Sequence, residues 1–312
     1  MRISVIIPAY NAARFLPETI ESVLCQSVRD WELLIVDDGS QDRTGEIASL
    51  YAEKDPRIRS FRLPNAGVAA ARNAGFQRSD RQTEFICYLD HDDLWVSDTL
   101  EVLIGALQAN SQFVAASGLP ESIDANGCPL DTDSVQAYCR DRFAVVGEQL
   151  IRQPEDQPTT FGCFAVRNCV ITPGLAVIRR TAHEKCGALD ESLSGYDDWD
   201  MWLRLSRLGD FAFLNRTILK YRLHETNQSR AHKTMEKQER LLYSKLFSAP
   251  DESPERLHQL RWGFRHRARL IYQDRLAWAR EAFRGGHYTA GLSQLRHGAR
   301  MYWRCMTGLG MR

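Results

Sequence analysis

The sequence predicts an α/β protein built on a mixed, mostly parallel sheet flanked by helices. Short runs rich in Val, Ile and Leu alternate with helical segments through residues 3–109. Strands that alternate with helices of this length are typical of parallel sheets with crossover helices. The apolar fraction of 44% and the charged fraction of 26% are those of an ordinary globular protein, so disorder is not expected to dominate.

The first half of the chain contains the clearest elements. The strand "ISVIIPAYN" (3–11) is a β-branched run that ends in a loop after Pro8. The strand "WELLIVDDGS" (31–40) runs into two aspartates and Gly39. Apolar residues at helical spacing indicate the helices around these strands. In order, the other expected elements are helices at 13–27 and 41–55, a weaker strand at 58–64, a small-residue helix at 66–79, a strand at 83–90 and a helix at 98–109.

The second half is less regular. Residues 117–172 mix short apolar pieces with Pro, Gly and Asp, and are expected to hold additional strands and loops. The pattern then predicts a strand at 174–180, a helix and turn at 181–193, an amphipathic helix at 198–209 and strand-rich structure at 211–224. From about residue 230 the pattern is helical, with two helices in 277–303 that join at Gly285 and Gly286.

A net charge of zero conceals an uneven distribution of charge along the chain. Residues 230–312 carry 17 Lys and Arg against 7 Asp and Glu, whereas residues 1–229 carry 23 against 33. The acidic part suits a site that binds metal cations. The basic tail suggests an anionic partner, either a membrane surface or an acidic polymer, with an Arg-rich solvated helix as the alternative.

The cysteines and apolar runs bear on the compartment. None of the eight cysteines forms a Cys-x-x-Cys pair, so a zinc ribbon or a thioredoxin-like site is unsupported. Several, such as Cys87 and Cys163, lie in apolar runs, as buried free thiols do. The apolar stretch at the N-terminus is short for a signal peptide, and no run reaches the ~18 apolar residues of a membrane span. We therefore expect a cytoplasmic protein with reduced thiols.

Polar side chains follow three of the predicted strands. They are Pro8 to Asn11, Asp37 and Asp38, and Asp90 to Asp93. Ligands of open α/β sheets bind at the carboxyl ends of strands, so these segments are expected to converge on one rim. Asp90 and Asp92 are separated by one residue and suit one hard cation, Mg²⁺ or Mn²⁺, whose other ligands would be water and a substrate diphosphate. An Asp-rich turn is the alternative.

Five side chains are candidates for individual roles in such a site, each with an ordinary structural alternative. Asp198 opens a predicted helix and suits a general base, although taken alone an N-cap is the more common role of such a residue. Asp38 suits a hydrogen bond to the imide of a nucleobase, or a simple turn. Tyr10 suits stacking on a base, or partial burial in a loop. His224 and Arg72 are candidates for metal or phosphate contacts, with a surface histidine and a solvated or ion-paired arginine as the alternatives.

Six segments in order resemble one known family. They are "VIIPAYN", "LLIVDDGSQDRT", "NAGVAAARNAG", "FICYLDHDDLW", "GLAVIRR" with "CGALDESL" and "YDDWDMWLRL", and "YRLHETNQS". Their order and approximate spacing resemble family 2 glycosyltransferases over about residues 1–230. The resemblance implies the GT-A fold, with a nucleotide-binding half at about 1–115 and an acceptor half at about 116–230. A basic helical C-terminal extension at 231–312 lies outside the shared region.

The resemblance also implies roles for individual residues. The nucleoside-binding positions it indicates are Pro8, Tyr10, Asn11 and Asp38. Asp90-His91-Asp92 resembles the DxD motif, which carries the metal and contacts the sugar nucleotide, with His224 as a further candidate ligand. Asp198 is similar to the family's catalytic base. The implied reaction is inverting: the base deprotonates an acceptor hydroxyl, which attacks the anomeric carbon of a UDP-, GDP- or dTDP-sugar, while Mn²⁺ or Mg²⁺ stabilises the departing diphosphate.

Three departures from the family pattern stand out. His91 fills a slot that is commonly a small residue, Asp197 replaces the usual Glu, and the link at 77–85 lacks the usual Ala-x-Gly-Glu. None of these removes a catalytic group.

The implied partners are a nucleotide-sugar donor and a glycan or glycolipid acceptor, in the synthesis of cell-surface polysaccharide or lipopolysaccharide. No nucleic-acid partner is expected. The basic C-terminal helices are a candidate for peripheral contact with the inner face of the membrane, and a helical hairpin packed on the catalytic region is the favoured alternative. Two other functions stay open: a nucleotidyltransferase, although "PAYNAARF" offers no Gly-rich phosphate loop, and a non-catalytic nucleotide- or carbohydrate-binding module.

Overall fold

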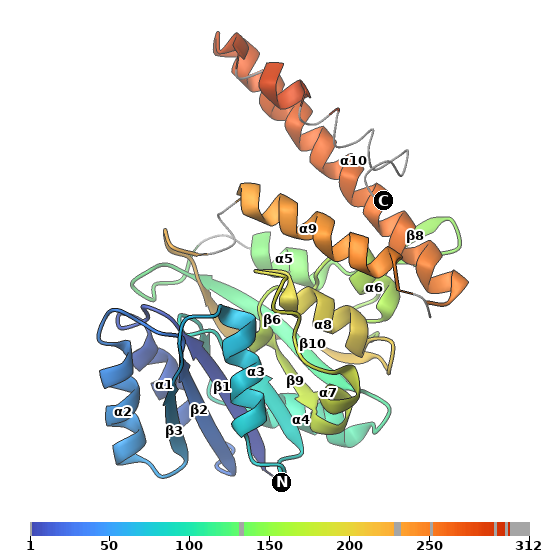
Figure 1. The fold of residues 1–312 in the computed structure, drawn as a ribbon. Helices are drawn as coiled ribbons and strands as arrows, with labels where there is room; N and C mark the ends of the chain where they lie inside the picture. The colour runs from blue at the N-terminus through green and yellow to red at the C-terminus, as the bar shows by residue number, and fades with distance from the viewer. Residues whose placement is uncertain are drawn as a thin grey trace.

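A mixed, mostly parallel sheet of eight strands forms the centre of the protein (Figure 1). The computed structural model describes residues 2–130, 134–227, 232–249, 252–289, 292–296 and 299. In sheet order the strands are β3 (Ile58–Arg62), β2 (Trp31–Asp37), β1 (Ile3–Ala9), β4 (Phe85–Tyr88), β9 (Ala176–Arg179), β6 (Ala115–Ile123), β10 (Phe211–Arg222) and β5 (Leu94–Trp95). Strands β3, β2, β1 and β4 are parallel to one another, β9 is antiparallel to both its neighbours, and β10 is parallel to β6.

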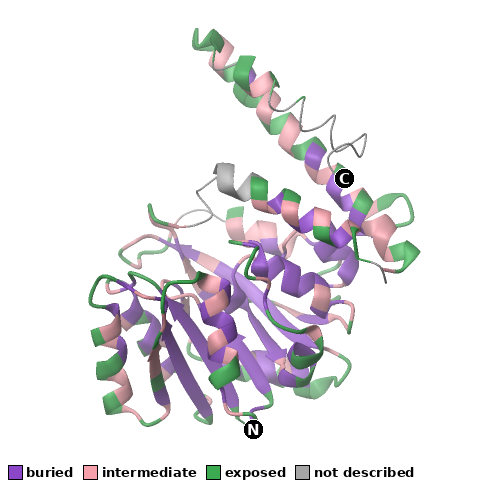
Figure 2. Ribbon diagram, viewed as in Figure 1, coloured by how far each residue is buried: buried purple, intermediate pink, exposed green. Residues whose placement is uncertain are grey.

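Helices cover both faces of this sheet. All residues of β1 and β2 are buried, as expected for parallel strands that are covered on two sides (Figure 2). The covering helices and their neighbours are α1 (Leu16–Leu24), α2 (Thr44–Lys54), α3 (Val68–Arg78), α4 (Thr99–Ala109), α7 (Arg180–Cys186) and α8 (Asp197–Leu205). The α/β prediction and the order of these elements are confirmed.

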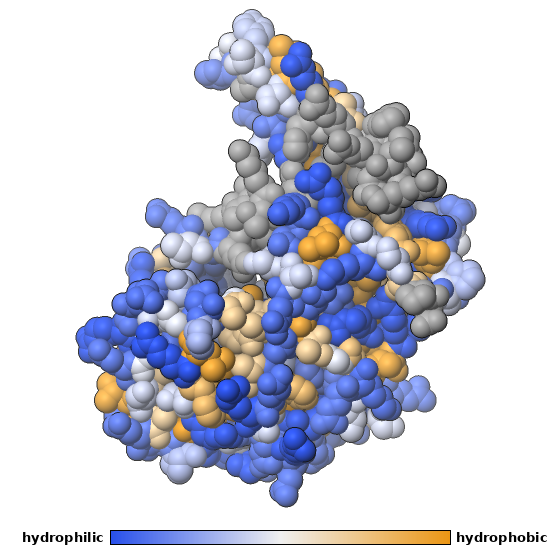
Figure 3. Space-filling model, viewed as in Figure 1, coloured by the Kyte–Doolittle hydropathy of each residue, from blue (hydrophilic) through white to orange (hydrophobic). Residues whose placement is uncertain are grey.

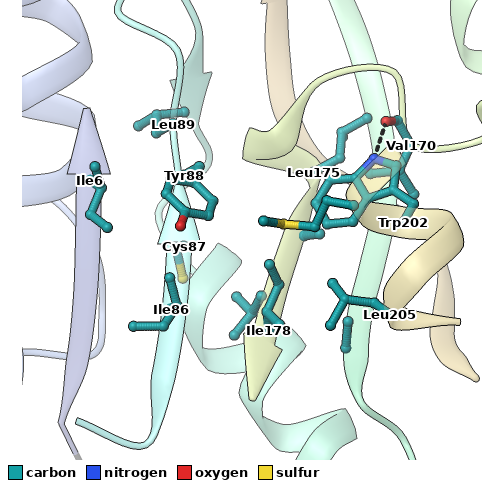
Figure 4. Close-up of a cluster of buried hydrophobic side chains, with 14 of the residues drawn as sticks. Ile6, Ile86, Cys87, Tyr88, Leu89, Val170, Leu175, Ile178, Trp202 and Leu205 are labelled. Carbon is teal, nitrogen blue, oxygen red and sulfur yellow. Dashed lines mark hydrogen bonds between the residues drawn. The ribbon is translucent and has the colours of Figure 1, made fainter. Parts of the chain in front are cut away.

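The small residues of α3 let this helix pack closely on the sheet. A Cβ atom on Gly75 would lie 2.4 Å from Cγ2 of Ile6 in β1, so only glycine fits at this contact. Trp202 of α8 enters the core, where its ring lies 5.7 Å from that of Phe211 in β10 and its indole donates a 3.0 Å hydrogen bond to the carbonyl of Val170 (Figure 4). The core therefore fixes α8, whose first residues reach the rim of the sheet.

The segment 117–172 contains more helix than the sequence predicted. Besides most of β6 it holds the hairpin β7 (Phe143–Val146) and β8 (Gln149–Arg152), and the short helices α5 (Ser134–Arg140) and α6 (Phe161–Val166). The two helices were not expected. All six residues of α6 are buried, so it has no polar face and no helical periodicity to detect. A 3₁₀ turn at Pro173–Leu175 then leads into β9.

The described part of the C-terminal extension includes the helices α9 and α10. Helix α9 (His232–Phe247) buries Leu242, Tyr243 and Leu246, and the Tyr243 ring lies 6.0 Å from that of Trp199 in α8. Helix α10 (Pro254–Arg284) starts with Ser253 as N-cap and ends at the predicted glycine pair. Part of the second helix expected in 277–303 lies outside the described residues.

The C-terminal half of α10 extends beyond the body of the protein (Figure 1). Its surface in the view of Figure 3 is largely hydrophilic, and Leu270 and Trp278 are its exposed large apolar side chains. Among the described residues, no helix has the length and apolarity needed to cross a bilayer. Peripheral contact of this extension with a membrane stays a prediction.

Helix α10 touches the backbone of α6 with no side chain between them. A Cβ atom on Gly263 would lie 2.0 Å from the carbonyl oxygen of Ala165. We expect Gly263→Ala to lower the free energy of unfolding by about 1–3 kcal/mol, because overpacking would push α10 off α6. Gly105→Ala in α4 is the matched control: nothing lies within 4 Å of its Cβ position, so it should stabilise by about 0.5–1 kcal/mol. Chemical denaturation measures both, and equal effects would contradict the close contact.

Candidate active site

All of the residues predicted for the site line one cleft. The cleft has a volume of about 1470 Å³ and opens at the carboxyl ends of the central strands. The predicted residues in its wall are Pro8, Tyr10, Asn11, Asp38, Arg72, Asp90, His91, Asp92, Asp198 and His224. They come from separate parts of the sequence, so the fold gathers them as the convergence of strand ends predicted.

The loop after β1 forms one end of the cleft. Tyr10 is 45% exposed, which leaves its ring open to a stacking partner. Asn11 adopts a left-handed backbone with φ of 49°. Its side-chain oxygen accepts a 2.8 Å hydrogen bond from the backbone N–H of Gln41, and its own N–H donates to Ser40 Oγ at 2.9 Å. These bonds hold the loop after β1 against the loop after β2.

Asp38 lies beside this end but is already engaged. One carboxylate oxygen accepts from the backbone N–H of Ala66 and the other from that of Gly67, both at 2.8 Å. The side chain is only 4% exposed. Asp38 therefore anchors the loop that leads into α3, and its proposed bond to a nucleobase would use the remaining lone pairs.

Three aspartates lie close together in the loop after β4, and different neighbouring groups contact each carboxylate. Arg72 of α3 pairs with one oxygen of Asp90 at 2.5 Å. Asp93 is buried, and burial together with the charges of Asp92 and Asp90 raises its pKa well above the usual range. The Thr172 hydroxyl lies 3.0 Å from Asp93 and 3.2 Å from Asp90. The Thr172 hydroxyl can therefore donate to either carboxylate, and it links Asp93 to Asp90.

The third member, Asp92, contacts a histidine from the end of β10. His224 Nε2 lies 2.8 Å from Asp92 Oδ2. Burial disfavours the charge of Asp92, but the hydrogen bond from His224 and the charges of His91 and His224 outweigh burial and lower the Asp92 pKa. His91 itself points back to β1, with Nδ1 3.3 Å from the carbonyl of Pro8.

These donors fit a hard divalent cation that binds together with a substrate. Asp92 and His224 supply one carboxylate and one imidazole side by side, whereas both oxygens of Asp90 are held by Arg72 and Thr172. Within the described ranges, no group of three His, Cys, Asp or Glu side chains is arranged to hold an ion. An ion would therefore take much of its shell from water and from diphosphate oxygens, as Mg²⁺ commonly does.

Two aspartates at the start of α8 have different surroundings. Asp197 receives Arg72 Nη1 on one oxygen at 2.6 Å. Asp198 accepts from the backbone N–H of Trp199 at 2.6 Å and from Asn168 Nδ2 at 3.3 Å. Burial, and next the charge of Asp197, raise the pKa of Asp198 from its ordinary 3.8 to about 8. A carboxylate with a raised pKa in a cleft is a candidate proton acceptor near neutral pH.

Arg72 lies in the cleft wall, where its guanidinium is held by two carboxylates. Its guanidinium joins Asp90 to Asp197, and it is only 4% exposed. A phosphate contact for Arg72 stays a prediction, whereas its bridge between the loop after β4 and helix α8 is observed.

Several site residues were not found by sequence reasoning. Asn168 and Thr172 lie in the irregular stretch 117–172. Because this stretch has no regular pattern of apolar residues, the sequence did not show which of its side chains face the site. Arg222 at the end of β10 is fully buried and donates to the carbonyl of Asp92 at 2.8 Å and to Glu18 at 2.6 Å. In the sequence, Arg222 could have been noticed only from its position two residues before His224. Tyr138 and Arg267 also line the cleft.

Comparison with known proteins gives a family and a fold. Residues 4–187 match the family described as glycosyl transferase family 2. The putative teichuronic acid biosynthesis glycosyltransferase TuaG of Bacillus subtilis is 32% identical over 224 residues, which are 71% of this chain and 79% of TuaG. The chain spans 64% or less of the length of several other curated relatives it matches.

Two solved structures are similar over nearly the whole chain. Staphylococcus aureus TarS 1–349 in complex with UDP-GlcNAc has a TM-score of 0.66 at 17% identity, covering 96% of this chain and 81% of that one. The mannosyltransferase PcManGT of Pyrobaculum calidifontis in complex with GDP-Man and Mn²⁺ has a TM-score of 0.59 at 18% identity, covering 99% and 83%. At such identities these structures show the fold alone. The family match over more than half of the chain, with the TuaG relationship and these neighbours, shows that the chain belongs to glycosyl transferase family 2 and has the GT-A fold.

Proposed function

We propose that this glycosyltransferase moves a sugar from a nucleotide-diphospho-sugar to an acceptor hydroxyl with inversion at the anomeric carbon. The observation that carries the proposal is the gathering of Asp38, Asp90, Asp92 and Asp198 around a single cleft. The family membership of the chain favours glycosyl transfer over nucleotidyl transfer.

The donor occupies the end of the cleft formed by the loops after β1 and β2. Tyr10 stacks on the base, and Asp38 with the Pro8–Asn11 loop holds the nucleoside. UDP-GlcNAc in the TarS complex and GDP-Man in the PcManGT complex support a nucleotide-sugar donor for this fold. The diphosphate lies toward Asp90, His91 and Asp92.

A Mn²⁺ or Mg²⁺ ion would be held by Asp92 and His224, with Asp90 close by. Such an ion supplies positive charge to the departing diphosphate. The Mn²⁺ named in the PcManGT complex supports this choice of metal. Arg222 holds the loop in place through the Asp92 carbonyl, so the donor end is preorganised by buried contacts.

Asp198 is the base that takes the proton of the acceptor hydroxyl. Asn168 and the N–H of Trp199 fix its carboxylate, and Asp197 is occupied by Arg72, which leaves Asp198 as the acid free to act. The acceptor then lies on the far side of Asp198 from the nucleoside. The name of TuaG, with that of a chondroitin synthase of Pasteurella multocida, supports a glycan acceptor in cell-surface polysaccharide synthesis.

Nucleotide binding is the direct test of this proposal. In a thermal shift experiment with UDP, GDP and dTDP, we expect one nucleotide to stabilise the protein in the presence of Mn²⁺ and much less in EDTA. At a nucleotide concentration one hundred times Kd, the gain is about 2.7 kcal/mol. Indifference to all three nucleotides with Mn²⁺ would count against the donor site. Mass spectrometry of nucleotide released from a panel of donor sugars then identifies the donor.

A further inference from the structure

The chain after β10 makes a short turn that carries His224 to the cleft. Asn227 closes this turn with its side chain. Its Oδ1 accepts a 2.5 Å hydrogen bond from the backbone N–H of His224, and its Nδ2 donates to the carbonyl of Arg222 at 3.1 Å. Arg222 in turn donates to the carbonyl of Asp92. The turn is therefore tied to the same loop that carries Asp92.

The imidazole of His224 is held on three sides. One face of the ring lies against Phe15, with the ring centres 4.8 Å apart. Nε2 lies 2.8 Å from Asp92 Oδ2, and Nδ1 lies 2.9 Å from the hydroxyl oxygen of Thr226. The His224 side chain is only 8% exposed. Both ring nitrogens thus have a defined neighbour, and the ring cannot rotate without losing these contacts.

Thr226 is not needed to hold the turn itself. It is exposed and lines the cleft, and Asn227 already supplies the two side-chain bonds that close the turn. Water can replace a partner of an exposed hydroxyl, so a single hydrogen bond of this kind adds little to folding stability. The contact of Thr226 with Nδ1 therefore points to a role that depends on the imidazole.

The hydroxyl of Thr226 suits both ways in which a neutral imidazole can carry its one proton. When the proton is on Nε2, that nitrogen donates to Asp92 and the hydroxyl donates to Nδ1. The Nε2 lone pair is available to a cation only when the proton is on Nδ1, and the hydroxyl oxygen then accepts it. Metal-binding histidines commonly donate their second N–H to a protein acceptor, which fixes the tautomer and the orientation of the ring.

We propose that Thr226 is a positioning residue for cation binding: its hydroxyl accepts the Nδ1–H of His224 and so presents the Nε2 lone pair beside Asp92. This inference rests on the proposed function only in taking His224 as a ligand of Mn²⁺ or Mg²⁺. The turn closed by Asn227 and the ring of Phe15 fix the position of the imidazole, and Thr226 selects its tautomer.

The test measures Mn²⁺ binding to the full chain from the EPR signal of free Mn²⁺. Titrations are made with Mn²⁺ alone and with UDP, GDP or dTDP, whichever stabilises the protein most. Thr226→Val removes the hydroxyl and keeps the branched shape. We expect it to raise the Kd for Mn²⁺ at least about tenfold, since loss of such a partner commonly costs about 10–100-fold in metal affinity.

Two further variants assign the effect to the hydroxyl. Thr226→Ser keeps the hydroxyl and should stay within about threefold of the wild-type Kd. Thr181→Val makes the same substitution at an exposed position of α7 outside the cleft wall and should leave Mn²⁺ binding unchanged. Nucleotide affinity in EDTA is measured alongside, and Thr226→Val should not alter it, because the hydroxyl acts through His224 rather than on the nucleotide.

The tautomer of His224 gives a second readout. Mg²⁺ is diamagnetic, so ¹⁵N NMR of the imidazole rings can be recorded with Mg²⁺ and the nucleotide bound, and His224→Gln assigns the signal. We expect the proton on Nδ1 in the wild-type complex. A proton that stays on Nε2 would show that this nitrogen does not bind the cation, and would overturn the proposal.

Three other outcomes also overturn it: wild-type Mn²⁺ affinity in Thr226→Val, an equal loss in Thr226→Ser, or an equal loss of nucleotide affinity with and without EDTA. Each of these leaves the proposed function intact, provided that the wild-type protein binds its nucleotide more tightly with Mn²⁺. A wild-type protein that binds neither Mn²⁺ nor any of the three nucleotides would contradict the proposed function and this inference together.

Discussion

Asp198→Asn is expected to lower kcat by about 10²–10⁴-fold while the protein still binds its nucleotide. The amide keeps the oxygen that accepts from the Trp199 N–H, so the start of α8 should keep its geometry. It cannot accept a proton at neutral pH, so the acceptor hydroxyl would have to attack without a base. Transfer is measured from released nucleotide, and binding from the nucleotide-dependent thermal shift.

Asp200→Asn is the matched control for this substitution. Asp200 lies on the same helix and is buried, but it pairs with Arg204 at 2.7 Å and is not part of the cleft wall. Its loss should cost some stability and leave kcat within a few-fold of wild type. Near-wild-type transfer by Asp198→Asn would show that the base is another group, and Asp197→Asn would then be the next variant to measure.

Asp198→Asn should also change how the stability of the folded protein depends on pH. The pKa of Asp198 is about 8 in the folded protein against an ordinary 3.8, so folding takes up a proton between these values. The carboxyl group therefore favours folding fully only below pH 4, and that contribution is lost as the pH rises to about 8. Asn does not titrate, so the Asp198→Asn variant escapes this loss. The Tm of the variant minus the Tm of the wild type should therefore be several degrees higher at pH 8.5 than at pH 5. An unchanged difference in Tm would contradict the raised pKa.

Asp92→Asn is expected to remove most of the metal dependence of nucleotide binding and to lower transfer by at least about 100-fold. The amide is a weaker ligand than a carboxylate for a hard cation, and it cancels the charge that pairs with His224. The measurement is a Mn²⁺ titration of transfer and of the thermal shift produced by the nucleotide.

Asp124→Asn separates this effect from a general loss of negative charge. Asp124 also lines the cleft, but its carboxylate closes a turn by accepting from the backbone N–H groups of Asn126 and Cys128. It should leave the Mn²⁺ dependence intact. If Asp92→Asn and Asp124→Asn behave alike, Asp92 has no special relation to the metal.

The strand ends were the part of the site that the sequence could predict. A buried strand is recognised by a continuous apolar run, and the residue where the run stops is readable to within a position or two. The apolar runs alone therefore place Asp38 and Asp90 at one rim of the sheet. Asp198 is 108 residues beyond Asp90, and its placement at the same rim needed the family resemblance.

The orientation of side chains and the residues they contact could not be predicted in the same way. Arg72 was identified from its place near a helix start, but the sequence does not show that it faces Asp197 on a helix 125 residues away. Asn168 follows α6, in which every residue is buried. The sequence of α6 therefore has no helical pattern of apolar and polar residues, and the direction of the Asn168 side chain could not be predicted from it. Arg267 belongs to a segment with no motif, and it reaches the cleft wall because α10 packs on α6.

The bare backbone contact of Gly263 with Ala165 has a practical consequence for cutting or grafting this enzyme. A fragment that stops at residue 230 matches the extent of the family-like sequence, yet it would uncover the Trp199 ring and delete both Arg267 of the cleft wall and Glu239, its ion-pair partner. A truncated or grafted version that keeps this side of the cleft intact must therefore include α9 and α10, with the cut placed after residue 284.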